Sequence, residues 1–98
     1  MMKFDPQLLQ QKYEQWRNLM AQLEQTQQQL QQAEQLWSQL QEYYQGEQWL
    51  QDAEQDLKIK CGEGHYSILG QDTLWNGLDE RKQLALQLMR LILKILES

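Results

Sequence analysis

The C-terminal run from residue 78 to residue 98 is the feature that most constrains the fold. It reads LDERKQLALQLMRLILKILES, and its polar positions recur at steps of four and three residues: Gln83, Gln87, Arg90, Lys94 and Glu97. Steps of that size place the five side chains along one narrow line on an α-helix. Because about two thirds of the circumference is then apolar, this helix needs cover on several sides. We therefore expect it to be the central element of a small all-α core.

A long N-terminal helix is the second expectation. Asp5 is a good N-cap, and Pro6 then occupies the first helical position, where its missing N–H costs nothing. No further Pro or Gly occurs before Gly46, which predicts one helix from Pro6 to about Tyr44. The chain has 21 glutamines, many of them in this segment. A disordered tract is the alternative, but Gln is a good helix former and the apolar spacing continues through the tract.

The apolar positions of this predicted helix follow a coiled-coil-like seam with one irregularity at Leu30. The seam is Leu9, Tyr13, Trp16, Met20, Leu23, Gln27, Leu30, Ala33, Trp37, Leu40 and Tyr44. At 1.5 Å per residue the helix would be about 58 Å long, roughly twice the length of the C-terminal helix. One C-terminal helix cannot cover both of its ends. We expect the interface of a homodimer at the N-terminal end, formed by Leu9, Tyr13, Trp16, Met20 and Leu23.

Shorter elements are expected between the two long helices. Gly46 fits a helix C′ position, where φ is usually positive. A short helix from Glu47 to about Leu57 would bury one apolar side, formed by Trp49, Leu50, Ala53 and Leu57. Three glycines predict a loop over residues 58–71.

A second short helix is expected over residues 73–76. Gly70 or Asp72 would cap it, a turn at Asn76-Gly77 would end it, and Asp79 would cap the final helix. The fold class is therefore all-α, with two short helices across a Gly-rich loop. The whole of residues 1–98 is expected to form one domain, a helical hairpin or bundle that dimerises.

Composition excludes some functions. The net charge is −5 and the pI about 4.7, and the interval from Arg17 to Lys58 holds no basic residue and seven acidic ones. Such a chain should repel nucleic acid and anionic membranes. Cys61 is the single cysteine, so no internal disulfide can form, and residues 1–7 contain no apolar signal segment. We expect a soluble, cytoplasmic protein.

Two short motifs carry a resemblance. A YY pair is followed by W-L-x-D, and a segment of the form L-S-x-D-x-x-[YW]-N follows a loop: Tyr43, Tyr44, Trp49, Leu50, Asp52, then residues 69–76. The chain thereby resembles the small bacterial proteins grouped as domain of unknown function 4298, in which a long polar helix also precedes these motifs. Gly70 departs from the expected Ser, which removes a hydroxyl cap, although Gly also tolerates an N-cap. The resemblance implies an α-helical cytoplasmic protein with no established activity, and it carries over no catalytic residues.

Three groups of residues invite a chemical interpretation. Cys61 and His65 suggest a metal half-site or a thiolate–imidazole pair, but a zinc site wants four ligands, so a half-buried Cys and a loop His are favoured. The acidic residues Glu47, Asp52, Glu54 and Asp56 would bind a cation or act as an acid–base pair, but a solvated face is favoured. The aromatic residues near the loop suit a core better than a pocket. They are Tyr43, Tyr44, Trp49, Tyr66 and Trp75.

Three functional hypotheses follow. The first is a non-enzymatic module that self-associates through the long helix, with no cofactor, no metal and no catalytic residue. The second is a small-molecule or metal-binding site at the loop, with or without catalysis, and its candidate ligand-binding set is Tyr44, Trp49, Asp52, His65, Asp72, Trp75 and Asn76. The third is an adaptor whose apolar stripe docks the helix of another protein partner. The pattern favours the first.

Overall fold

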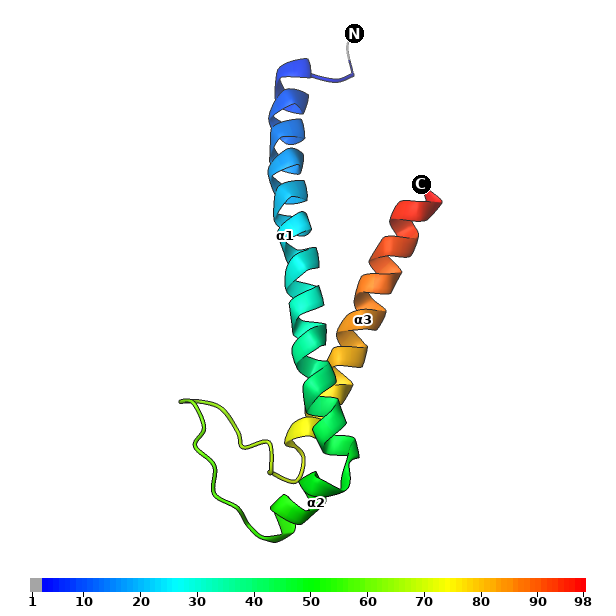
Figure 1. Cartoon of the computed structure of the whole chain (residues 1–98). Coiled ribbons are helices and arrows are strands. Elements are labelled where there is room, and N and C mark those ends of the chain that lie inside the picture. Colours follow the sequence, from blue (N-terminus) through cyan, green and yellow to red (C-terminus); the bar gives the residue numbers. More distant parts are fainter. Residues whose placement is uncertain (1–2) are drawn as a thin grey trace. The chain divides into compact units, whose positions relative to one another are not determined.

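The computed structural model describes residues 3–98, and in that range it contains three helices. They are α1 (Pro6–Gln45), α2 (Glu47–Glu54) and α3 (Thr73–Glu97), shown in Figure 1. The all-α class and the long N-terminal helix are confirmed. The chain divides into two compact units, Met1–Gln39 and Leu40–Ser98. The single domain over residues 1–98 stays a prediction.

Helix α1 begins as the sequence predicts and ends one residue later than expected. The Asp5 carboxylate accepts a hydrogen bond from the Gln7 amide at 3.1 Å, and the Asp5 carbonyl accepts one from the Leu9 amide at 3.0 Å. The aspartate therefore caps the helix. Further along, the Thr26 hydroxyl donates to the Gln22 carbonyl at 3.0 Å, within the helix. The helical interpretation of the glutamine-rich tract is confirmed.

The junction between α1 and α2 differs from expectation. Gly46 has φ −82° and ψ 171°, so its backbone is extended, and the predicted positive φ is wrong. Its amide donates to the Tyr43 carbonyl at 3.2 Å, which closes the last turn of α1. Gly46 is at the same time the N-cap of α2, a position that glycine tolerates. One extended residue therefore joins the two helices.

Helix α2 ends at Glu54, earlier than the predicted Leu57. The Asp56 amide donates to the Ala53 carbonyl at 3.2 Å, and the Leu57 amide donates to the Asp52 carbonyl at 3.4 Å. Those two bonds form a Schellman motif, whose C′ residue is normally glycine in the left-handed region. Here Asp56 holds that position with φ 53°. The predicted buried side is only partly right, because Leu50 and Leu57 are exposed while Trp49 and Ala53 are half-buried.

The predicted loop is confirmed, and two turns organise it. The His65 amide donates to the Gly62 carbonyl at 3.1 Å, and Gly64 has φ 79°, as a type II turn requires at its third residue. In the second turn the Gly70 amide donates to the Ser67 carbonyl at 3.0 Å. A β-carbon on Gly70 would lie 3.1 Å from that carbonyl oxygen and 2.8 Å from the Thr73 hydroxyl oxygen, so a side chain does not fit there without movement.

Helix α3 is continuous from Thr73 to Glu97, so the predicted short helix, the Asn76-Gly77 turn and the Asp79 cap are wrong. The Asn76 amide donates to the Asp72 carbonyl at 2.8 Å, and the helix continues through Gly77. One glycine inside a helix costs about 1 kcal/mol relative to alanine. A break would cost more, since each new helix end leaves four backbone groups without partners. Asp72 is the N-cap, although its side chain makes no capping bond.

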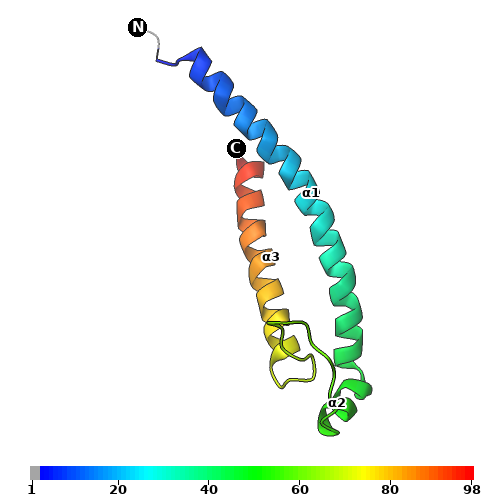
Figure 2. The ribbon, with the colours of Figure 1, turned by 90° about the vertical axis from the view of Figure 1, so that its left-hand side faces the viewer.

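Buried apolar side chains are scarce. Over residues 3–98 the one buried hydrophobic side chain is Leu74, at 4% exposure, in the first turn of α3. Figure 2 shows the loop that follows α2 leading back to this turn. The rest of α3 is not the covered central helix that its pattern predicts, because its large apolar side chains from residue 84 onward are mostly exposed. None of the three helices combines the length and apolarity that a membrane span needs.

Candidate functional site

The motif residues around α2 form a set of contacts within the unit Leu40–Ser98. The Tyr43 hydroxyl, in the last turn of α1, donates to the Asp52 carboxylate at 2.7 Å. The Gln48 side-chain amide, one turn before Asp52 on α2, donates to the same carboxylate oxygen at 3.4 Å. Both Tyr43 and Asp52 are half-buried. Asp52 therefore joins two consecutive helices across Gly46 and is not part of a purely solvated acidic face.

Trp49 connects α2 to the loop. Its indole N–H donates to the Ile68 carbonyl at 2.8 Å, and its ring packs edge-on against Tyr44 with ring centroids 4.8 Å apart. The Ile68 carbonyl lies inside the second loop turn, where the Ser67 hydroxyl also accepts a bond from the Leu69 amide at 3.1 Å. The tryptophan thus holds a loop turn against α2 across 19 residues of sequence. The Trp49 indole, the Ile68 carbonyl and the Ser67 hydroxyl therefore attach the loop to α2, and their hydrogen bonds are made within the protein.

The Tyr43–Asp52 hydrogen bond sets a pH dependence. The bond to Asp52 raises the pKa of Tyr43, with further contributions from desolvation and from the negative charge of the carboxylate. Because the neutral phenol is the stabilised form, its contribution to stability is complete below the ordinary tyrosine pKa of about 10. The contribution is lost as the pH rises through the raised value.

We expect Asp52→Asn to lower the pKa of Tyr43, because the charged acceptor is removed. A pH titration followed by tyrosine NMR signals measures this shift, and Tyr43→Phe identifies the signal by removing it. An unchanged Tyr43 pKa in Asp52→Asn would show that the two side chains do not interact in solution.

The other members of the candidate ligand-binding set do not join these contacts. Asp72, Asn76 and His65 are exposed, and Trp75 is 60% exposed. Tyr66 is also outside any aromatic core, at 88% exposure. Within the candidate set, the rings of Tyr44 and Trp49 pack against each other. The carboxylate of Asp52 is bonded to residues outside the set, Tyr43 and Gln48. The ligand-binding role of the set stays a prediction.

Cys61 and His65 lie in the loop between α2 and α3. Cys61 is exposed, not half-buried as expected, and its thiol lies 3.9 Å from the Ile59 carbonyl. The imidazole of His65 lies close to Gly62, within the first turn. Within residues 3–98 no group of three or more His, Cys, Asp or Glu side chains is arranged to hold a metal ion.

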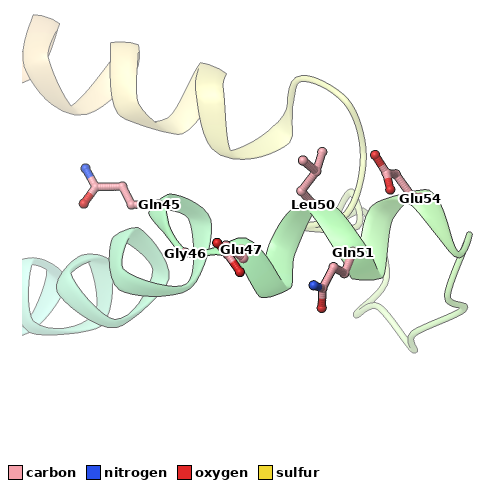
Figure 3. A pocket seen from close by; sticks show the side chains of 6 residues that line it. All are labelled: Gln45, Gly46, Glu47, Leu50, Gln51 and Glu54. Atoms are coloured by element: carbon pink, nitrogen blue, oxygen red, sulfur yellow. The ribbon is translucent and has the colours of Figure 1, made fainter.

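A depression of about 430 Å³ lies along α2 and the end of α1. Figure 3 shows its six lining residues: Gln45, Gly46, Glu47, Leu50, Gln51 and Glu54. The side chains drawn there point in different directions and do not converge on a common point. None of them belongs to the candidate ligand-binding set. The depression lacks the enclosed apolar lining and convergent polar groups that small-molecule sites usually have.

Exposed apolar side chains are the prominent surface feature of the unit Met1–Gln39. Tyr13 and Trp16 lie with ring centroids 5.9 Å apart, and the Arg17 guanidinium lies 5.7 Å from the Trp16 ring. Met20 is half-buried one turn later. Tyr, Trp, Met and Arg are the residues that protein interfaces favour. The large hydrophobic residues exposed on this part of α1 are Leu8, Leu9, Tyr13, Trp16, Leu19, Leu23, Leu30 and Leu36.

Helix α3 carries a second exposed apolar surface, in the other unit. From residue 84 onward, eight of its large side chains are 43–75% exposed: Leu84, Leu86, Met89, Leu91, Ile92, Leu93, Ile95 and Leu96. A shallow hollow of about 330 Å³ lies among Lys82, Ala85, Leu86 and Met89. Monomeric proteins rarely leave so many neighbouring apolar side chains in water. The exposed apolar surface of α3 therefore suggests a partner.

Three features of the loop region escaped the sequence reasoning: the Ile68 carbonyl that receives the Trp49 indole, the turn at Ser67, and the buried Leu74. A signal for the turn was present, because Ser67 and Gly70 flank two apolar residues at turn spacing. No residue pattern marks a backbone carbonyl as the partner of a distant indole. That contact depends on how the loop returns to α2.

Comparison with protein families identifies the chain. Residues 7–91 match the family described as Domain of unknown function (DUF4298), and the chain belongs to that family. The match covers α1 after its first residue, α2, the loop and most of α3, and so confirms the resemblance found in the sequence. Searches of curated proteins and of solved structures give no match.

Proposed function

We propose that this member of the DUF4298 family is a non-enzymatic association module that binds a second copy of itself through its exposed helical faces. The observation that carries the proposal is the apolar surface of α1, where Tyr13, Trp16, Met20 and Arg17 occur together. The burial of such side chains is the main driving force for protein association. Closed two-fold dimers are the commonest way to achieve it.

Helix lengths support the need for a partner. Helix α1 has 40 residues and α3 has 25, which correspond to about 60 Å and about 38 Å at 1.5 Å per residue. Wherever α3 lies, it can cover no more than about two thirds of α1. A large part of the seam therefore remains for another chain to cover. The apolar surface of α3 also lacks cover, because most of its large side chains are exposed. The apolar surfaces of both α1 and α3 therefore support the proposal of a partner.

The test is the stoichiometry of a charged variant. We expect the wild-type chain to be a dimer by native mass spectrometry and light scattering, and the Trp16→Glu/Met20→Glu variant to be a monomer, since buried carboxylates at an apolar interface are costly. The matched control is Gln15→Glu/Gln22→Glu, which adds the same charge to the same turns of α1 off the seam and should stay dimeric. Circular dichroism checks that each variant keeps its helices.

Either of two outcomes would contradict the proposal. A wild-type chain that is monomeric at micromolar concentration has no second copy on its apolar faces. A charged variant that stays as dimeric as its control shows that the surface around Trp16 and Met20 is not the interface.

A further inference from the structure

We infer that the two copies pair through α1 in an antiparallel orientation, with the two-fold axis near Thr26 and Gln27. The inference rests on the proposed self-association and adds its geometry. The spacing of the seam positions fits this pairing and sets its register, although an in-register parallel pair would match the seam as well. The distribution of charge along the helix is what favours the antiparallel orientation.

The seam of α1 matches its own reversal. When the helix is turned end for end about a point between Thr26 and Gln27, ten of the eleven seam positions fall opposite another seam position. The pairs are Leu9 with Tyr44, Tyr13 with Leu40, Trp16 with Trp37, Met20 with Ala33, and Leu23 with Leu30. The unmatched position is Gln27, which faces Thr26 of the partner subunit at the axis. Apolar residues thus meet apolar residues along the seam, except at the axis, where Gln27 meets Thr26 of the partner subunit.

The axis coincides with the polar middle of the helix. Residues 24–32 read EQTQQQLQQ, with Leu30 as the single apolar residue. A polar residue at one seam position specifies register and orientation at some cost in stability. The side-chain amides of the two Gln27 residues lie near the axis and can hydrogen-bond to each other. Their polar groups therefore have partners when the two copies are centred on this point. A shifted register would place Gln27 against an apolar residue.

Charge along α1 favours the same orientation. The only basic residues of the helix, Lys12 and Arg17, lie in its N-terminal third, which also holds Glu14 and has a net charge of +1. The rest of the helix holds Glu24, Glu34 and Glu42 and has a net charge of −3. Antiparallel pairing brings the basic end of one copy beside the acidic end of the other. Parallel pairing would place each glutamate beside the same glutamate of the other chain, and the like charges would repel each other. Complementary charges at the flanks of a coiled coil set partner orientation in this way.

The exposed fractions of the seam residues are compatible with this pairing. Leu9, Tyr13, Trp16, Leu23 and Leu30 are exposed and free to receive a partner. Three of their counterparts near the C-terminal end of α1 are half-buried, so part of each side chain remains exposed for a partner: Trp37, Leu40 and Tyr44.

Disulfide cross-linking in a Cys61→Ser background tests the orientation. We expect a mixture of Met20→Cys and Ala33→Cys chains to give at least tenfold more covalent dimer than either variant alone in a glutathione redox buffer. In the antiparallel pair, the two residues at position 20 lie about 20 Å apart along the helix axis. A disulfide needs α-carbons within about 7 Å of each other. Gln27→Cys, at the axis, should cross-link by itself.

The outcomes separate the inference from the proposed function. Efficient cross-linking of Met20→Cys alone means a parallel pair, which overturns the inference and leaves self-association standing. A chain that is dimeric by light scattering but gives no excess of the mixed cross-link also overturns the inference. A monomeric chain without cross-links in any variant overturns both.

Discussion

Replacing Trp49 with alanine is expected to lower the free energy of unfolding of the unit Leu40–Ser98 by about 3 kcal/mol. The side chain is half-buried, packs edge-on against Tyr44 and donates its indole N–H to the Ile68 carbonyl. Its removal costs the packing, the aromatic pair and the hydrogen bond, and leaves a part-buried carbonyl without a partner. The loop turn at residues 67–70 would lose its attachment to α2.

The Trp49→Phe variant separates the two parts of this effect. Phenylalanine keeps an aromatic ring beside Tyr44 and lacks the N–H, so we expect a loss of about 1 kcal/mol. Chemical denaturation followed by circular dichroism measures both variants, at one protein concentration because association shifts apparent stability. Hydrogen exchange of the Leu69 and Gly70 amides reports the loop directly. A Trp49→Ala effect below 1 kcal/mol would contradict the attachment.

Replacing Leu74 with alanine is expected to cost about 2.5 kcal/mol. Leu74 is 4% exposed, and it lies in the first turn of α3 directly after the loop. Shortening a buried leucine removes apolar contact and leaves a cavity that the surroundings fill only in part. The loss should therefore loosen the start of α3 and the loop together.

Leu50→Ala is the matched control for this prediction. Leu50 is the same residue type in the same unit but is 54% exposed, so we expect a loss below about 0.5 kcal/mol. The ratio of the two effects, measured by the same denaturation, checks the burial pattern. Equal effects at both positions would contradict the assignment of Leu74 as the buried residue of the unit.

Local signals in the sequence predicted the helix α1 well. Asp5 and Pro6 mark its start by capping chemistry, and the absence of Gly and Pro up to Gly46 marks its extent. The motif from Tyr43 to Asn76 indicated the family that residues 7–91 match. The loop over residues 58–71 followed from its glycines. These features depend on a few neighbouring residues, which is why the sequence alone was sufficient for them.

Helix ends and turns in the middle of the chain were harder to predict. The Asn76-Gly77 pair is a common turn signal, yet α3 runs through it because a continuous helix satisfies more backbone groups than a broken one. Gly46 was expected at a left-handed position, but that conformation falls on Asp56 at the end of α2.

The sequence by itself determined the all-α class, the bounds of α1, the glycine loop and the apolar faces of the two long helices, because capping and helical periodicity act between residues a few positions apart. Only the tertiary structure decided that Trp49 binds the Ile68 carbonyl, that Asp52 receives the Tyr43 hydroxyl, that Leu74 is buried and that α3 stays exposed. The two hydrogen bonds join residues 19 and nine positions apart in the chain, and the burial of a side chain depends on the elements that pack around it. Their free energy depends on which surfaces are brought together in space, and helical periodicity does not specify that.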